Sequence, residues 1–148
     1  VLAHRTGTAT WITFNIGDSR VYLLRSGVLT QMSHDHSQVQ ALIDAGQLTR
    51  DQARRDPRKN VVTRALGAGL DQEAVPDIRT VDAQCGDRLL ICSDGLSDEL
   101  DDEALATVLD AGMRPQHTAE AAVAAALEAG GHDNTTALVV DLVPESAL

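Results

Sequence analysis

Short apolar runs separated by turn residues are the feature that most constrains this chain. Runs of four to nine residues rich in Val, Ile, Leu and aromatic side chains are typical of strands, and they exclude an all-helical fold. The turn signals Gly17-Asp18 and Ser26-Gly27 separate the first three runs, so we expect these three to form an antiparallel meander. The expected strands are residues 11–16 (WITFNI), 21–24, 28–32, 61–66, 76–81, 88–92 and 135–143.

Helical periodicity appears in two separate parts of the chain. Val39, Leu42 and Ile43 share one helical face within residues 33–46. Thr49 and Gln52 form a capping box for a short helix over residues 50–55. Later, Asp101 is an N-cap residue for a helix that ends before Gly112, and an alanine-rich helix follows over residues 115–129. Because the helices are grouped rather than alternating with strands, the pattern predicts the α+β class.

Composition limits the partners and the compartment. With 148 residues, 43% of them apolar, the chain is long enough for one domain with a real core. A net charge of −10 argues against nucleic acid or an anionic membrane as a partner. No apolar run approaches the about 20 residues of a membrane span, and no signal peptide is visible, so we expect a cytoplasmic protein. Cys92 lies in an apolar run and is expected in the core.

Three aspartates lie at the ends of expected strands, each beside Gly or Asn. Asp18 follows residues 11–16, Asp94 follows residues 88–92, and Asp133 precedes residues 135–143. Carboxylates that converge repel one another and need cations, and carboxylate oxygen suits Mg²⁺ or Mn²⁺. Gly95 would allow backbone and water to approach Asp94 closely. Convergence is a hypothesis at this point, since ordinary turn chemistry explains each acid taken alone.

Four segments follow one another along the chain: FNIGDSRVYLLRSGVLTQMSHDHS, VVTRALG, GDRLLICSDGLSDELDDEAL and GGHDNTTALVVD. In their order and spacing they resemble the metal-dependent protein Ser/Thr phosphatases, the PPM or type 2C (PP2C) family, and most of all its bacterial branch. The resemblance covers about residues 11–141 and implies the α-β-β-α sandwich of this family, in which two antiparallel sheets pack between helix layers. The string of four motifs is specific, although no single motif would be.

The resemblance implies an enzyme that hydrolyses phosphoserine and phosphothreonine in proteins. Asp94 and Asp133 match acids that bind the metal centre, and Asp18 matches the acid associated with a third, weaker metal. Two or three Mn²⁺ or Mg²⁺ ions would activate a water molecule, so no side chain is assigned as the catalytic nucleophile. Residues 33–60 match the flap beside the active site. Ser93, Gly95 and Asn134 are expected to support the metal ligands.

The same resemblance implies that part of the family domain is missing. The family has an Asn-Glu-Asp segment, an Asp-Gly-x-Gly-Gly-His segment and a phosphate-binding arginine upstream of the matched region, and neither of the two segments occurs in residues 1–148. We therefore expect residues 1–148 to be the C-terminal portion of one phosphatase domain, inactive alone and with exposed apolar edges. The alternatives are a natural truncation that acts as a catalytically dead binding or regulatory module, and a divalent-metal sensor without hydrolysis.

Several charged residues outside the three aspartates could serve the structure alone or could take part in binding substrate or metal. Arg58 and Lys59 belong to a basic cluster in the expected flap, which is a solvated surface by default and a weak candidate for docking substrate. Arg20 is expected to pair with an acid or with backbone. His34 and His36 are expected at the flap hinge rather than as metal ligands. Expected partners are phosphorylated proteins, together with a Ser/Thr kinase that shares those targets.

Overall fold

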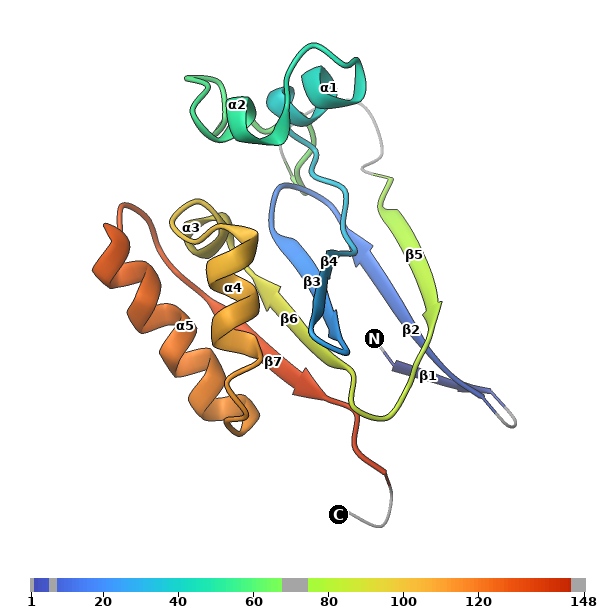
Figure 1. Cartoon of the computed structure of the whole chain (residues 1–148). Coiled ribbons are helices and arrows are strands. Elements are labelled where there is room, and N and C mark those ends of the chain that lie inside the picture. The colour runs from blue at the N-terminus through green and yellow to red at the C-terminus, as the bar shows by residue number, and fades with distance from the viewer. Residues whose placement is uncertain (1, 6–7, 68–74, 145–148) are drawn as a thin grey trace.

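The computed structural model describes residues 2–5, 8–67 and 75–144, which form two antiparallel sheets and five helices (Figure 1). The elements in chain order are β1 Leu2–Arg5, β2 Thr8–Asn15, β3 Arg20–Arg25, β4 Val28–Gln31, α1 Gln38–Asp44, α2 Arg50–Arg54, β5 Asp77–Asp82, β6 Arg88–Cys92, α3 Asp94–Ser97, α4 Asp102–Leu109, α5 Pro115–Ala129 and β7 Ala137–Asp141.

The strands divide into a three-stranded sheet, β1-β2-β5, and a four-stranded sheet, β4-β3-β6-β7. Every neighbouring pair is antiparallel. The expected three-strand meander is wrong, because β2 and β3 are consecutive in the chain but lie in different sheets. Gly17, at φ +110°, lies in the turn between them, and this conformation favours glycine. The chain therefore leaves one sheet and enters the other at the turn that carries Asp18.

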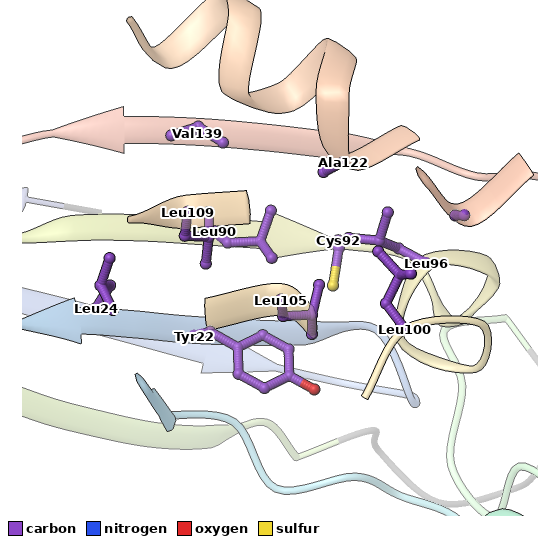
Figure 2. Close-up of a cluster of buried hydrophobic side chains, with 11 residues drawn as sticks. Tyr22, Leu24, Leu90, Cys92, Leu96, Leu100, Leu105, Leu109, Ala122 and Val139 are labelled. Carbon is purple, nitrogen blue, oxygen red and sulfur yellow. The ribbon is translucent and has the colours of Figure 1, made fainter. Parts of the chain in front are cut away.

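The four-stranded sheet packs against apolar side chains on both faces, although Ile91 and Leu138 on its two last strands are 36% and 54% exposed. On its outer face, Tyr22, Leu90, Cys92 and Val139 pack against side chains from the helices (Figure 2). The helices contribute Leu96, Leu100, Leu105, Leu109, Ala122 and Ala126. Cys92 is only 3% exposed, which confirms its assignment to the core. Within the described ranges, no helix is both long and apolar enough to cross a membrane.

The inner faces of the two sheets enclose a second cluster, formed by Trp11, Val21, Leu23 and Leu89. Beside this cluster, the Asp87 side chain is fully buried at the start of β6. Its carboxylate accepts hydrogen bonds from the Trp11 indole at 2.8 Å and from two Arg25 nitrogens at 2.7 Å. Since a buried carboxylate is tolerated only when it is fully bonded, these contacts fix β6 against the other sheet.

The outer face of the three-stranded sheet carries exposed apolar side chains, unlike the helix-covered outer face of the four-stranded sheet. Phe14 on β2 and Ile78 on β5 lie opposite each other, and they are 60% and 61% exposed. Trp11 and Thr13, which point to the inner face, are buried. The expected exposure of apolar surface is thus found on this sheet, on the face away from the core.

The flap region, residues 33–60, contains α1 and α2, which lie beyond one end of the strands (Figure 1). The predicted capping box is confirmed, since Thr49 and Gln52 cap α2 reciprocally. The predicted strand over residues 61–66 is wrong, because this segment forms only an isolated bridge between Ser37 and Val62. Val61, Val62 and Leu66 are 46%, 40% and 77% exposed, so the apolar run lies on the surface at the base of the flap rather than in a sheet.

Candidate metal centre

Asp94 is held by the strand that precedes it. β6 lies between β3 and β7, and the chain passes from Cys92 through Ser93 directly into α3, whose first residue is Asp94. The Asp94 carboxylate Oδ1 accepts the backbone N–H of Gly95 at 2.9 Å. A side chain at the junction of a central strand and a helix has a well-defined position. The sequence predicted the strand but not α3.

Gly95 and Ser93 join the Asp94 turn to the loop that carries Asp133. The Ser93 hydroxyl donates to the Asn134 carbonyl at 3.1 Å and accepts the Thr136 N–H at 3.0 Å. A Cβ atom on residue 95 would overlap the Asn134 carbonyl oxygen and lie 3.0 Å from its carbon. Glycine is therefore required at this position because two backbone segments touch. The close approach expected at Gly95 is found, and the approaching backbone is that of Asn134.

Asp133 lies on the exposed side of this junction. Its Oδ1 accepts the Asn134 backbone N–H at 2.6 Å, so the carboxylate caps its own turn. Among the described residues, Asp133 does not line the cavity that Asp18 and Asp94 share. The structure thus places the Asp133 loop against the Asp94 turn, with the Asp133 carboxylate on the surface.

A cavity of about 310 Å³ lies between the flap and the end of the sheets. Asp18 and Asp94 both line it, although Asp18 follows β2 and Asp94 follows β6. The flap contributes basic side chains, and the α3–α4 segment contributes acidic ones. The charged lining comprises Asp18, Arg20, Asp35, Arg50, Asp51, Arg54, Lys59, Asp94, Asp98, Asp101, Asp102 and Glu103.

The electrostatics of Asp18 reveal an excess of negative charge in this cavity. Partial burial raises the pKa of Asp18, and the charge of Asp94 raises it further, with smaller contributions from Asp35 and Asp98. A divalent cation would offset this repulsion, and carboxylate oxygens are ligands that Mg²⁺ and Mn²⁺ accept. Across residues 2–5, 8–67 and 75–144, no group of three or more His, Cys, Asp or Glu is arranged to hold a metal ion. The described chain therefore brings Asp18 and Asp94 together, and a metal held there needs further ligands.

The turn that carries Asp18 is fixed by side chains from other segments. The Gly17 N–H donates to His36 Nδ1 at 3.1 Å, and the Gly17 carbonyl accepts the His36 N–H at 2.8 Å. Asn15 Nδ2 also donates to the Gly17 carbonyl, at 3.0 Å. Sequence reasoning assigned His36 to the flap hinge and missed these contacts, because nothing in the local pattern connects residue 36 with residue 17.

Arg20 pairs with a buried acid, as predicted. Its Nε and Nη2 atoms donate to Asp35 Oδ2 at 2.8 and 2.6 Å, and Asp35 is 5% exposed. Gln31 donates to the other Asp35 oxygen at 2.9 Å and accepts a hydrogen bond from Arg50 of α2. A continuous set of polar contacts therefore runs from β3 to the flap.

The flap also touches the helix that carries Asp94. Lys59 pairs with Asp98 at 2.6 Å, and Arg54 donates to the carbonyls of Ser97 and Asp98 at 3.0 and 3.3 Å. Arg58 instead pairs with Asp56, and its hydrogen bonds lower the pKa of Asp56 to about 2. Of the two candidate docking residues, Lys59 lines the cavity, whereas Arg58 is turned to its own loop.

Known proteins share both the sequence and the fold. The family model for protein phosphatase 2C matches residues 1–129. The chain is 43% identical over 131 residues to the serine/threonine protein phosphatase PstP of Mycobacterium tuberculosis, which covers 87% of this chain and 24% of PstP. The crystal structure of PstP/Ppp from M. tuberculosis superposes with a TM-score of 0.84 at 37% identity, over 97% of this chain and 58% of that one.

A second solved structure of similar fold contains bound metal ions. It is the PstP catalytic domain in complex with two manganese ions, and it matches with a TM-score of 0.81 at 37% identity, over 97% of this chain and 57% of that one. The chain thus spans well under two thirds of these relatives. Because the family model covers far more than half of the 148 residues and the fold agrees, the chain belongs to the protein phosphatase 2C family.

Proposed function

We propose that the full-length protein hydrolyses phosphoserine and phosphothreonine in other proteins by means of a metal-activated water. The observation that carries the proposal is that Asp18 and Asp94 line the same cavity. Burial and the charge of Asp94 raise the pKa of Asp18 there. Relatives with the same fold are named serine/threonine protein phosphatases, and one holds two manganese ions.

In this proposal Asp94 and Asp133 bind the divalent ions and Asp18 holds a third, weaker one. Residues 1–148 are the C-terminal portion of the domain, and the remaining ligands come from other segments of it. A bound Mn²⁺ or Mg²⁺ would activate water for attack on phosphorus and offset charge on the phosphoryl oxygens. The requirement for additional ligands fits the finding that the described residues include no group of three metal-binding side chains.

The chain's own residues then have distinct tasks. The Ser93 hydroxyl and the Gly95 backbone both contact the Asn134 carbonyl, and these contacts hold the Asp94 turn and the Asp133 loop together. Lys59 presents a positive charge at the cavity, where it can attract a phosphorylated segment. Arg58 is a weaker docking candidate because its side chain is turned to Asp56 of its own loop and does not line the cavity. Burial raises the pKa of the neighbouring Cys92 thiol to about 12, so this sulfur stays protonated and does not serve as a nucleophile.

The proposed partners are phosphorylated proteins and a Ser/Thr kinase that acts on the same targets, in the cytoplasm. The acidic chain, with 22 Asp and Glu against 12 Lys and Arg, supports a protein partner rather than nucleic acid. Phosphoproteins would approach through the basic side of the cavity, since the flap supplies Arg50, Arg54 and Lys59 there.

Hydrolysis of p-nitrophenyl phosphate tests the proposal. The full-length protein should be active with Mn²⁺ or Mg²⁺ and should lose activity in chelator, whereas residues 1–148 alone should be inactive. The second candidate is a catalytically dead binding or regulatory module, favoured by the incomplete set of metal-binding side chains in the described residues. A full-length protein that binds phosphoproteins but hydrolyses neither them nor p-nitrophenyl phosphate at any metal concentration would establish this second candidate.

A further inference from the structure

His36 lies at the base of the flap, one residue before the N-cap of α1, and is 6% exposed. Its backbone N–H and its ring Nδ1 both bond to Gly17, one to the carbonyl and the other to the amide. Gly17 directly precedes Asp18, and its backbone N–H and carbonyl are therefore both bonded to His36, 19 positions later in the sequence.

The ring orientation follows from these contacts. Because Nδ1 accepts the Gly17 N–H, the ring proton lies on Nε2, which donates to Asp77 Oδ2 at 3.0 Å. Arg64 Nη1 lies 3.0 Å from the same nitrogen and donates to the Val75 carbonyl.

A second histidine extends the contacts to the flap helix. His34 Nε2 lies 3.0 Å from Asp44, the last residue of α1, and His34 Nδ1 lies 3.8 Å from Asp77. Asp77, at the start of β5, thus lies between both histidines of the His34-Asp35-His36 segment. These contacts run from the end of α1 through His34, Asp77 and His36 to Gly17.

We propose that His36 is a positioning residue that holds the Asp18 carboxylate in the cavity, an inference that rests on the proposed function. Asp18 is repelled by Asp94, Asp35 and Asp98, and Gly17 gives the turn the freedom to swing away from them. The bonds from His36 oppose this movement. His36 acts on the metal site through the backbone of Gly17, and it is not itself a ligand.

Two substitutions in the full-length protein test the roles of the two ring nitrogens, Nδ1 and Nε2, separately. His36→Asn keeps an acceptor near the Nδ1 position and loses the bond to Asp77, whereas His36→Gln places its amide near the Nε2 position and loses the acceptor for Gly17. Mn²⁺ binding is measured by the electron paramagnetic resonance of free Mn²⁺. Hydrogen exchange of the Gly17 amide is measured in parallel without metal, as a readout of the turn itself.

We expect His36→Gln to weaken the lowest-affinity Mn²⁺ site about 10- to 100-fold, as loss of groups that orient metal ligands does, and to accelerate Gly17 exchange. His36→Asn should retain most of the wild-type Mn²⁺ affinity and most of the protection of the Gly17 amide from exchange. Equal effects of the two substitutions, or unchanged Mn²⁺ binding and Gly17 exchange in His36→Gln, would overturn the inference. If His36→Gln does not fold, His36→Ala replaces it, because alanine also lacks the acceptor for the Gly17 N–H, and unchanged Mn²⁺ binding in that variant has the same consequence.

Measurements on Asp18→Asn distinguish a failure of this inference from a failure of the proposed function. If Asp18→Asn weakens Mn²⁺ binding and His36→Gln does not, the role of His36 is wrong and the metal site stands. If Asp18→Asn also leaves Mn²⁺ binding and hydrolysis unchanged, the assignment of Asp18 is wrong and the inference falls with it.

Discussion

The two turns that carry Asp94 and Asp18 face the same cavity, but they are held by different means. Asp94 follows a strand that contributes to both core clusters, and its turn is joined to the loop of Asn134 by the short Ser93 side chain and by the Gly95 backbone. Asp18 follows β2, and its turn is held by the longer side chains of Asn15 and His36. We call the first the rigid side of the site and the second, which is bonded to the base of the flap through His36, the adjustable side.

The difference has a physical origin in the two sheets. β6 has apolar neighbours on both faces and is fixed at its start by the buried Asp87, so little freedom is left where it ends. The outer face of β2 carries the exposed Phe14, and the Gly17 turn crosses from one sheet to the other. Asp18 is therefore placed by tertiary contacts with the flap base rather than by its own strand.

The largest effect is expected on the rigid side, from Asp94→Asn. Loss of groups that merely orient metal ligands typically costs 10- to 100-fold, so loss of a ligand itself should lower kcat by on the order of 100-fold or more. The fold should persist, because Asp94 is not part of either core cluster. The measurement is hydrolysis of p-nitrophenyl phosphate by the full-length protein with Mn²⁺, beside its melting curve. Wild-type activity in a folded variant would remove Asp94 from the site.

Gly95→Ala should have the next largest effect. Its Cβ would overlap the Asn134 carbonyl, which is backbone and has little room to move, so we expect a loss of about 1–3 kcal/mol of stability. Activity should also fall about 10-fold or more as the Asp94 turn separates from the loop of Asp133. Gly27→Ala is a matched control, since it strains a turn at φ +75° with no atom within 4 Å. It should lose stability and keep its activity, and the same activity loss in both variants would contradict the account.

On the adjustable side, Asp18→Asn should lower activity less, and part of the loss should be recovered at high Mn²⁺. In chelator the same substitution should raise the melting temperature slightly at neutral pH. The pKa of Asp18 is raised in the fold by burial and by Asp94, so its ionised form destabilises the folded state once pH rises above the ordinary carboxyl range. Calorimetry in chelator between pH 4 and pH 7 measures this directly. A lower melting temperature at pH 7 would argue against crowding of these acids.

The smallest effect is expected in the flap, from Lys59→Ala. Lys59 is partly exposed and already paired with Asp98, so an ion pair between it and a bound phosphate should contribute at most about 1 kcal/mol, and KM for a phosphopeptide should rise by no more than about five-fold. Arg58→Ala changes the charge equally but removes a residue that does not line the cavity, and it should leave KM unchanged. Equal KM shifts in the two variants would make the effect one of net charge rather than of docking.

Local signals in the sequence predicted the elements on the rigid side well. The apolar run of β6, the Asp101 cap of α4 and the α5 boundaries from Pro115 to Ala129 are confirmed, because each depends on residues close together in the chain. Asp94 could be placed at the end of a strand for the same reason. What the pattern did not indicate is that Ser93 and Gly95 bind the loop of Asn134, about 40 residues later.

The adjustable side was predicted less well, because it is built from distant contacts. The first three strand-like runs looked like one meander, yet the pairing of β3 with β6 and of β2 with β5 outweighs their proximity in sequence. Residues 61–66 have strand-like composition but no sheet edge beside them. His36 could be assigned only to a hinge, since its partners Gly17 and Asp77 lie 19 and 41 positions away.

The central claim is that Asp18, Asp94 and Asp133 contribute to one divalent-metal centre in the complete domain. Anomalous diffraction from crystals of the full-length protein grown with Mn²⁺ tests this most directly. We predict peaks within coordination distance of Asp94 and Asp133, and a weaker peak beside Asp18 that disappears first as Mn²⁺ is lowered. Mn²⁺ bound elsewhere, with all three carboxylates free of metal, would contradict the account.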